Sequence, residues 1–394
     1  MNREVVITGA CRTPIGNFGG YFSDVSATRL GSIVIADVIK RSGIKNTNVN
    51  EVFLGCVLQA GIGQNIARQA SIMAGVPVEV PATTINMVCG SGLKTVCLAA
   101  QSIISGDGDI IIAGGTENMS QSPYILKEMR WGVKMGEVKS IDSMIHDALT
   151  DAFNQHHMGI TAENIAEKLN ITRVEQDSYA AMSQQRAESA QRKKTFKDEI
   201  ISVKVKLKKD EFKLIDEDEY LRYGTTVEKL SLLKPAFKIN GTVTAGNSSG
   251  INDGAAALVL MSGEKAHELG IKPLVKILSY ASTGIDPSIM GMGPVESCKK
   301  ALQKANLTIG DIGLVEVNEA FAVQTIACIT SLGISIERVN VNGGAIAIGH
   351  PIGASGARVL VTLIYEMIRR NERYGMAALC IGGGMGITVI VKKA

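Results

Sequence analysis

Hydrophobic residues in the first 115 positions recur in two patterns that alternate along the chain. Short apolar runs rich in β-branched residues, at 5–8, 52–57 and 109–113, predict buried strands. Between them, apolar residues three and four positions apart predict helices over about 27–41 and 65–73. Strands that alternate with helices predict an α/β layer in which helices cover a largely buried sheet.

The same alternation returns after about residue 250. Apolar runs predict strands, and helical periodicity predicts the helices between them. The strands are expected at 255–261, 274–279, 313–317, 376–381 and 387–391, and the helices near 295–305, 321–332 and 354–369.

These two stretches are predicted to be one unit written twice. Small and apolar positions match at an offset of 263 or 264 residues. The matches are Gly43 with Asn306, Val52 with Val315, Gly92 with Gly356 and, if the second copy carries a four-residue insertion, Gly114-Gly115 with Gly382-Gly383. The repeat predicts that Cys89 and the glycine-rich loop 349–356 take equivalent places in two halves that pack together.

The pattern changes between the two stretches. Thr172 and Glu175 form a capping box that predicts a long polar helix through about Arg192. Alternation at 203–207 predicts a strand half exposed to water. We interpret the region as a loop domain inserted into the first half, lying over a cleft. The domains are expected at 1–117 (with part of 251–270), 118–250 and 271–394.

Composition predicts a soluble enzyme. Of 394 residues, 45% are hydrophobic and 20% charged, which implies a large core, and the formal net charge of +3 is too small to argue for nucleic acid. We expect no signal peptide, no membrane-spanning run and no peroxisomal tail, hence a cytoplasmic protein. The seven cysteines include no C-x-x-C pair, which predicts free thiols rather than disulfides or a zinc site.

Charge is uneven in the middle of the chain. Nine Lys and Arg lie at 186–209, and six Asp and Glu follow at 210–219. A solvated helix followed by a solvated hairpin would explain this, and a nearby phosphate-bearing ligand is the alternative.

Cys89 lies where a predicted strand, 83–85, meets a helix expected to begin near Ser91. The N–H groups and positive end of that helix would favour the thiolate, and the glycines at 90 and 92 would let a substrate approach the backbone. A small buried hydrophobe is the alternative for a lone cysteine.

Three further stretches place reactive side chains beside loops. Asn318 ends a predicted strand, His350 lies in a loop rich in glycine, and Cys380 ends another strand. Taken singly, each could be structural: a helix cap, a core histidine or a buried cysteine. A dinucleotide site at 382–386 is disfavoured because no βαβ unit follows, and no ligand cluster near 151–157 supports a metal.

Together these stretches resemble the four signature motifs of the thiolases. They read Asn-Met-Val-Cys-Gly-Ser-Gly around Cys89, Asn-Glu-Ala-Phe from Asn318, Gly-His-Pro-Ile-Gly around His350 and Cys-Ile-Gly-Gly-Gly-Met-Gly from Cys380. The likeness covers essentially the whole chain, and residues 157–164 resemble the biosynthetic acetoacetyl-CoA type. It implies a thiolase fold: two similar α/β halves packed in five layers (αβαβα) with an inserted loop domain.

The resemblance also implies the reaction, a Claisen condensation of two acetyl-CoA to acetoacetyl-CoA and CoA. Cys89 would attack the first thioester with His350 accepting its proton, and Cys380 would deprotonate the second. His350 and a water held by Asn318 would stabilise the enolate, while the amides of Cys89 and Gly382 would serve the acyl-enzyme carbonyl.

For the substrates, the resemblance implies a coenzyme A tunnel in the inserted domain. Its expected residues are Arg222, Ser249, His157, Met158, Leu149, Phe237, Met290 and Phe321. It implies CoA thioesters as substrates, no permanently bound cofactor or metal, and a homotetramer built as a dimer of dimers, for which the only tryptophan, Trp131, is a candidate contact or an ordinary loop anchor.

Three alternatives stay open. A thiolase of fatty-acid degradation would cleave longer 3-ketoacyl-CoA chains. A non-catalytic acyl-CoA carrier would not need Cys89, His350 and Cys380. A decarboxylating ketoacyl synthase would be expected to carry a second histidine in place of Cys380.

Overall fold

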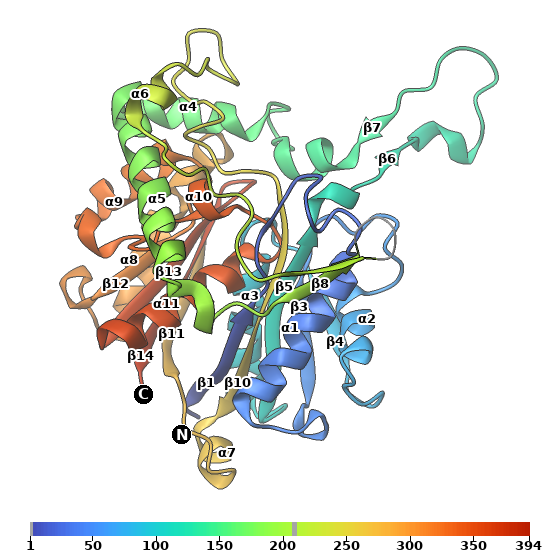
Figure 1. Ribbon diagram of the computed structural model, residues 1–394, viewed down its shortest axis with the longest axis vertical. Coiled ribbons are helices and arrows are strands. Elements are labelled where there is room, and N and C mark those ends of the chain that lie inside the picture. The colour runs from blue at the N-terminus through green and yellow to red at the C-terminus, as the bar shows by residue number, and fades with distance from the viewer. Residues whose placement is uncertain (1–2, 207–210) are drawn as a thin grey trace.

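The two repeated stretches each build one half of a large sheet (Figure 1). The computed structural model describes residues 3–206 and 211–394. In the strand order β12-β13-β14-β11-β1-β10-β5-β3-β4, four strands of each half correspond across the seam between β11 and β1, and β4 is an additional edge strand of the first half. At the seam, Val6 faces Lys276 and Ile7 faces Val275. The first half contains β1 (Val5–Arg12), β3 (Glu51–Gly55), β4 (Ala82–Ile85), β5 (Ile110–Asn118) and β10 (Asn252–Ser262), with β2 (Gly16–Asn17) beside β10, and the second contains β11 (Val275–Gly284), β12 (Leu314–Val317), β13 (Tyr374–Ile381) and β14 (Met385–Lys393).

Helices form three layers around the two half-sheets (Figure 1). The central helices pack on strands of both halves in one hydrophobic cluster, and a separate cluster lies under the outer helices of each half. This gives the expected αβαβα order. The central layer contains α3 (Ser91–Ser105) and α11 (Ser355–Arg370), the first outer layer α1 (Ala27–Ser42) and α2 (Ile66–Met73), and the second α8 (Gly293–Ala305) and α9 (Ala322–Leu332), with α7 (Gly263–Glu268) between β10 and β11.

The internal repeat is present, but one of its expected matches is wrong. β3 and β12 begin 263 residues apart, at Glu51 and Leu314, and β5 and β13 begin 264 apart. Leu54 pairs with Gly114 just as Val317 pairs with Ala378. Gly114 therefore corresponds to Ala378 with no insertion, and the glycines at 382–384 belong to the turn between β13 and β14.

The predicted elements occur within a few residues of the expected positions. Thr172 and Glu175 form the capping box that opens α5 (Arg173–Arg192). The exposed strand is β8 (Val203–Lys206), paired with β9 (Phe212–Ile215); its expected last residue, Leu207, lies outside the described residues, as do 208–210 of the charge reversal. One expectation fails: residues 88–105 have the length and mean hydropathy (1.2) of a membrane span, although 56% of this stretch is buried. It is α3, whose apolar faces pack between the half-sheets.

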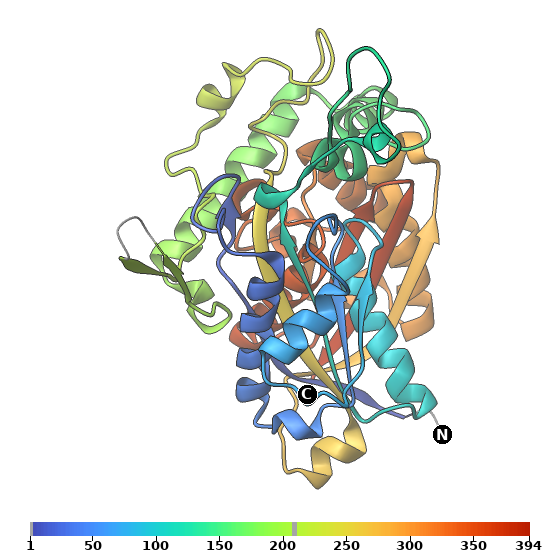
Figure 2. The same ribbon diagram turned by 90° about the vertical axis from the view of Figure 1, so that its right-hand side faces the viewer.

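Most residues between β5 and β10 lie at one end of the sheet, and the β8–β9 hairpin lies beside the first half (Figures 1 and 2). One part is a projecting arm with exposed apolar side chains, and the helices of the rest pack against α9 and α10 (Ala345–Ile348). The β8–β9 hairpin packs on the outer hydrophobic cluster of the first half. The arm contains β6 (Tyr124–Ile125), η3 (Lys127–Arg130) and β7 (Ile141–Asp142), between η2 (Met119–Gln121) and the π-helical turn η4 (Ile145–Leu149). The packed part contains α4 (Met158–Leu169), α5, η5 (Thr195–Asp198), β8, β9 and α6 (Val227–Ser231). The remaining short elements are η1 (Asn46–Asn48), η7 (Pro287–Met292), η8 (Ile309–Asp311), η9 (Ile336–Arg338) and α10 (Ala345–Ile348).

A buried ion cluster ties this region to the sheet. Arg12 at the end of β1 donates from Nε to Glu199 (2.6 Å) and from Nη1 to Asp218 (2.7 Å), and its side chain is 0% exposed. Such a cluster adds little net stability, because desolvation offsets the attraction, but it fixes the register of the parts it joins.

The central helices touch through backbone at their first turns. A Cβ added to Gly356 would lie 2.3 Å from the amide nitrogen of Leu93, and one added to Gly92 would lie 2.8 Å from that of Ala357. Only glycine permits this approach, so the starts of α3 and α11 are locked together.

We therefore predict that Gly356→Ala lowers the free energy of unfolding by about 2–3 kcal/mol, because backbone would have to move to make room. The control is Gly310→Ala, where the added methyl meets only Thr308 Oγ1 at 3.6 Å. Urea unfolding curves of both variants check this. Equal stability of the two would contradict the close contact.

Candidate active site

Cys89 is presented by a strained turn between β4 and α3. Val88, just before it, has a φ of 47°, which is rare for a β-branched residue. Ser91 holds the turn closed: its Oγ accepts from the Met87 amide (2.8 Å) and donates to the Val88 carbonyl (2.6 Å). The helix begins at Ser91 as predicted, so the sulfur lies beside its first turn.

Burial has a larger effect on the pKa of Cys89 than the neighbouring backbone amides have. Burial raises the pKa of Cys89 to about 11, although the amides of Gly382 and Cys89 lower it, and the nearby Glu117 raises it further. The two amides do not compensate for desolvation, so the raised pKa favours the thiol at neutral pH. The amides favour the thiolate, which is the direction predicted for N–H groups at this turn, but burial has the larger effect.

His350 carries its proton on the side away from the pocket. Ser355 Oγ donates its hydrogen to the Pro351 carbonyl (2.8 Å) and therefore accepts from His350 Nδ1 (2.6 Å). Nε2 is buried, has no hydrogen-bond partner and is free to accept a proton. Burial, with help from the charge of Arg358, lowers the pKa of His350 to about 3, so the ring is neutral.

Cys380, Asn318 and Gly382 come together at the ends of β12 and β13. These strands are parallel neighbours, and the Asn318 amide donates to Ala378, two residues before Cys380. Both side-chain polar atoms of Asn318 are buried without a partner. Burial raises the pKa of Cys380, and the next cause is its interaction with Cys89. The Gly382 amide also interacts with Cys89, so both cysteines and this amide meet at one place.

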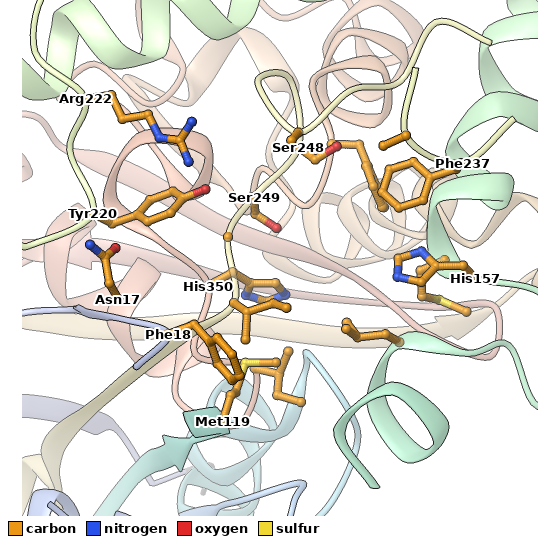
Figure 3. Close-up of a pocket in the computed structure, with 18 of the residues that line it drawn as sticks. Asn17, Phe18, Met119, His157, Tyr220, Arg222, Phe237, Ser248, Ser249 and His350 are labelled. Atoms are coloured by element: carbon orange, nitrogen blue, oxygen red, sulfur yellow. The ribbon is translucent and has the colours of Figure 1, made fainter. Parts of the chain in front are cut away.

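A pocket of about 620 Å³ opens in front of His350 (Figure 3). It is lined largely by apolar side chains, with a few polar groups at one side. Seven of the eight residues expected to bind coenzyme A line it: Arg222, Ser249, His157, Met158, Leu149, Phe237 and Phe321. The eighth, Met290, does not; it is 3% exposed and lies in the hydrophobic cluster behind Met158 and Phe321.

His157 and Phe237 form one wall of this pocket (Figure 3). Their rings stack with centroids 4.6 Å apart. His157 Nδ1 accepts from the Gly159 amide (3.0 Å), so its hydrogen is on Nε2. Burial lowers the pKa of His157, which makes this neutral ring a hydrogen-bond donor at neutral pH.

The polar side of the pocket includes Arg222, as expected, but not the described residues of the basic stretch before it. Arg222 lies over the ring of Tyr220, with 5.6 Å from its guanidinium carbon to the ring centroid. Among the described residues, none of the basic stretch 186–206 lines the pocket, so the excess charge there is not positioned to meet a ligand's phosphates.

Sequence reasoning missed several lining residues. They are Asn17, Phe18, Met119, Tyr220, Ser248, Ile251 and Ile352. Of these, Phe18 had one usable signal, since it is a large aromatic residue that follows Gly16 and Asn17.

Comparisons with known proteins cover the same span as the two halves. The model of "Thiolase, N-terminal domain" matches residues 5–264, and that of "Thiolase, C-terminal domain" matches residues 271–393. The chain belongs to the thiolase family. Its fold is therefore the thiolase fold that the motifs around Cys89, Asn318, His350 and Cys380 predicted.

Full-length relatives and solved structures resemble this thiolase. The "Acetyl-CoA acetyltransferase" of Syntrophomonas wolfei is 58% identical over 100% of both chains, and that of Chromobacterium violaceum is 55% identical over 99% of this chain and 100% of the relative. A crystal structure of the Bacillus anthracis acetyl-CoA acetyltransferase has a TM-score of 0.98 at 42% identity, covering 100% of both chains. A crystal structure of human mitochondrial 3-ketoacyl-CoA thiolase has a TM-score of 0.97 at 42% sequence identity, and the match covers 100% of this chain and 99% of that chain.

The turn at Cys89 gives a first prediction for this thiolase. Ser91→Ala removes the groups that close the turn, so we expect a loss of about 1–3 kcal/mol in the free energy of unfolding and an altered rate of Cys89 alkylation. Ser105→Ala, at the exposed end of the same helix, should change stability by less than about 0.5 kcal/mol. Urea unfolding and iodoacetamide labelling measure both effects, and identical behaviour of the two variants would contradict the role of Ser91.

The raised pKa of Cys89 gives a second prediction. Only the thiolate is alkylated, and below a pKa of about 11 its fraction rises tenfold per pH unit. The labelling rate of Cys89, followed by peptide mass, should therefore climb steadily from pH 7 to pH 10. A plateau near pH 8 would show that the thiolate is already stabilised. Cys89→Ser provides the blank.

Proposed function

We propose that this thiolase is an acetyl-CoA C-acetyltransferase, which condenses two acetyl-CoA into acetoacetyl-CoA and CoA and catalyses the reverse thiolysis. The supporting observation is the meeting of Cys89, Cys380 and the Gly382 amide beside a pocket into which His350 faces. The full-length relatives named acetyl-CoA acetyltransferase support the acetyl group as the substrate.

In the first half-reaction, the sulfur of Cys89 attacks the thioester carbonyl of acetyl-CoA. Because both groups are neutral at rest, the thiol gives its proton to His350 Nε2 as the new carbon–sulfur bond forms. The bond to the CoA sulfur then breaks, and CoA leaves with that proton. The product is an acetyl group on Cys89.

In the second half-reaction, Cys380 first releases its own proton to the medium, and its thiolate then removes a proton from the methyl carbon of a second acetyl-CoA. The carbanion attacks the acetyl carbonyl, the bond to Cys89 breaks, and acetoacetyl-CoA leaves. The methyl proton passes from Cys380 to the Cys89 sulfur, which restores the Cys89 thiol, and Cys380 regains from the medium the proton that it released. The buried, unpaired amide of Asn318 would order a water against the enolate oxygen, and His350 would donate a hydrogen bond there while its Nε2 carries a proton.

The oxyanion of the acyl-enzyme step would lie against the amides of Cys89 and Gly382. Donors held in place before the reaction stabilise developing charge without reorganising, and the loss of one typically costs about 3–4 kcal/mol. A Cβ at Gly382 would meet Val88 Cγ1 at 3.5 Å and Met158 Sδ at 3.6 Å, so a bare backbone leaves this amide accessible.

Coenzyme A would occupy the 620 Å³ pocket. Arg222 is suited to the nucleotide end, while Ser249, His157, Phe237 and Phe321 line a path for the pantetheine towards His350. The Nε2–H of His157 gives this apolar wall a single donor, which suits an amide or hydroxyl of the pantetheine.

We also propose a homotetramer in the cytoplasm. The arm exposes Trp131 (91%), Met135 (93%) and Tyr124 (68%), more apolar surface than an isolated loop normally carries, and a second copy would cover it. The seven free cysteines favour a reducing compartment.

Three alternatives to this function were open: a thiolase of longer acyl chains, a ketoacyl synthase and a non-catalytic carrier. The likeness to human mitochondrial 3-ketoacyl-CoA thiolase favours the alternative that this protein cleaves longer 3-ketoacyl-CoA substrates. A ketoacyl synthase is disfavoured by Cys380 and a non-catalytic carrier by the presence of Cys89, His350 and Cys380.

Intact-protein mass spectrometry tests the proposal. Incubation with acetyl-CoA should add one acetyl group, and Cys89→Ala should add none, whereas Cys380→Ala should acquire the acetyl group but form no acetoacetyl-CoA. An acetyl group that persists in Cys89→Ala would sink the assignment of the nucleophile.

Thiolysis rates separate the chain lengths. With CoA present, we expect acetoacetyl-CoA to be cleaved at least tenfold faster, in kcat/KM, than a C8 3-ketoacyl-CoA, which corresponds to a difference of about 1.4 kcal/mol in transition-state binding. Equal or inverted rates would favour the degradative enzyme.

A further inference from the structure

Glu117, at the end of β5, is a fully buried carboxylate between the two halves. Its Oε2 accepts from the amides of Val57 (3.0 Å) and Gly353 (2.8 Å), and its Oε1 accepts from the amide of Leu58 (3.1 Å) and the thiol of Cys56 (3.4 Å). Three of these donors belong to the segment after β3 in the first half. The fourth belongs to the loop that carries His350 in the second.

Gly353 is seated in a slot that has no room for a side chain. Its carbonyl oxygen would lie 2.0 Å from a Cβ at Gly115, 2.7 Å from one at Gly55 and 3.0 Å from one at Gly92. Backbone from β3, β5 and α3 therefore surrounds the His350 loop, and the Glu117 carboxylate supplies a hydrogen-bond acceptor inside that slot.

The same carboxylate holds the surface on which the nucleophile packs. Cys89 lies against a buried cluster that includes Val57, Leu58 and Ile352. The first two donate their amides to Glu117, and Ile352 adjoins Gly353. One side chain thus fixes neighbours of both Cys89 and His350.

We propose that Glu117 is a positioning residue of the condensation, holding the His350 loop at a fixed place relative to the segment that supports Cys89. The inference rests on the proposed function, because it assigns Glu117 to the transfer step between these residues. Misplacing a reacting group by about 1 Å can cost 10²-fold in rate.

The charge of Glu117 gives a second way to test this proposal, through the pKa of Cys89. The titratable groups on the elements that meet here are Glu117 and Cys56 from the first half, Cys89 beside them, and His350 and Cys380 from the second. After burial and the backbone amides, the charge of Glu117 contributes to the raised pKa of Cys89. Neutralising Glu117 should therefore make Cys89 easier to ionise while catalysis becomes slower.

The test compares two variants. In Glu117→Gln, the amide group cannot accept from all four donors, so at least one loses its partner. We expect kcat to fall about 10- to 100-fold with KM within about threefold, the peptide spanning Gly353 to exchange its amide hydrogens faster, and the alkylation midpoint of Cys89 to move to lower pH. Glu117→Asp keeps the charge but shortens the reach, so kcat should fall while the midpoint stays.

Glu163→Gln is the matched control. Glu163 is a 2% exposed carboxylate that accepts from the amides of Thr242 and Val243, away from Gly353. It should leave both the Gly353 exchange and the Cys89 midpoint at wild-type values. Wild-type kcat in Glu117→Gln, or a loss of kcat with unchanged exchange at Gly353, would overturn the proposal.

Two of these measurements, amide exchange at Gly353 and alkylation of Cys89, do not involve CoA. If wild-type protein fails to transfer acetyl groups, the proposed function falls, and exchange and alkylation still report whether Glu117 holds the loop. If Glu117→Gln does not fold, Glu117→Asp carries the same measurements.

Discussion

The close contact between the two halves is the constraint on which the site depends. At Gly353, Gly356 and Gly92, segments of the two halves approach each other backbone to backbone, so a side chain at any of these positions fits only if the neighbouring backbone moves. Interiors packed at this density deform little, which transmits the position of one half directly to the other. Cys89 belongs to the first half and His350 and Cys380 to the second, so their relative geometry is set by this contact rather than by any single loop.

Burial gives the site its second property. Each reactive group is held in its neutral form, with Cys89 and Cys380 as thiols and His350 as imidazole. A dry site makes an isolated thiolate costly, and it also strengthens every interaction with charge that develops during a reaction. In the proposed mechanism, the Cys89 thiol is therefore unreactive at rest and becomes a nucleophile as its proton moves to His350 Nε2, whose lone pair the hydrogen bond from Nδ1 to Ser355 leaves free.

Much of the fold was predictable because the buried layers leave a clear periodicity in the sequence. Helix and strand positions in both halves, and the capping box at Thr172, follow from local spacing. The match of Gly114 to Gly382 failed because glycine serves two purposes here: close packing in a strand and a tight turn in a hairpin. Nothing in the residue pattern distinguishes these.

The candidate site was only partly predictable for the same reason. Motifs identify Cys89, Asn318, His350 and Cys380, but the direction of a pKa shift depends on burial, which only the packed structure determines. Met290 was expected in the pocket and lies behind its wall, and Glu117 carried no sequence signal at all. Contacts between residues hundreds of positions apart leave no local pattern.

The paired starts of α3 and α11 also bear on the medium in which the protein works. Both helices begin at this contact, so the positive ends of two peptide dipoles lie close together, and that of α3 begins two residues after Cys89. Dissolved ions screen charges on the surface but do not reach dipoles locked inside a closed core. A centre built from backbone polarity in this way would be largely indifferent to the salt content of its surroundings, and electrolyte would act on it mainly through the encounter with charged ligands at the pocket mouth.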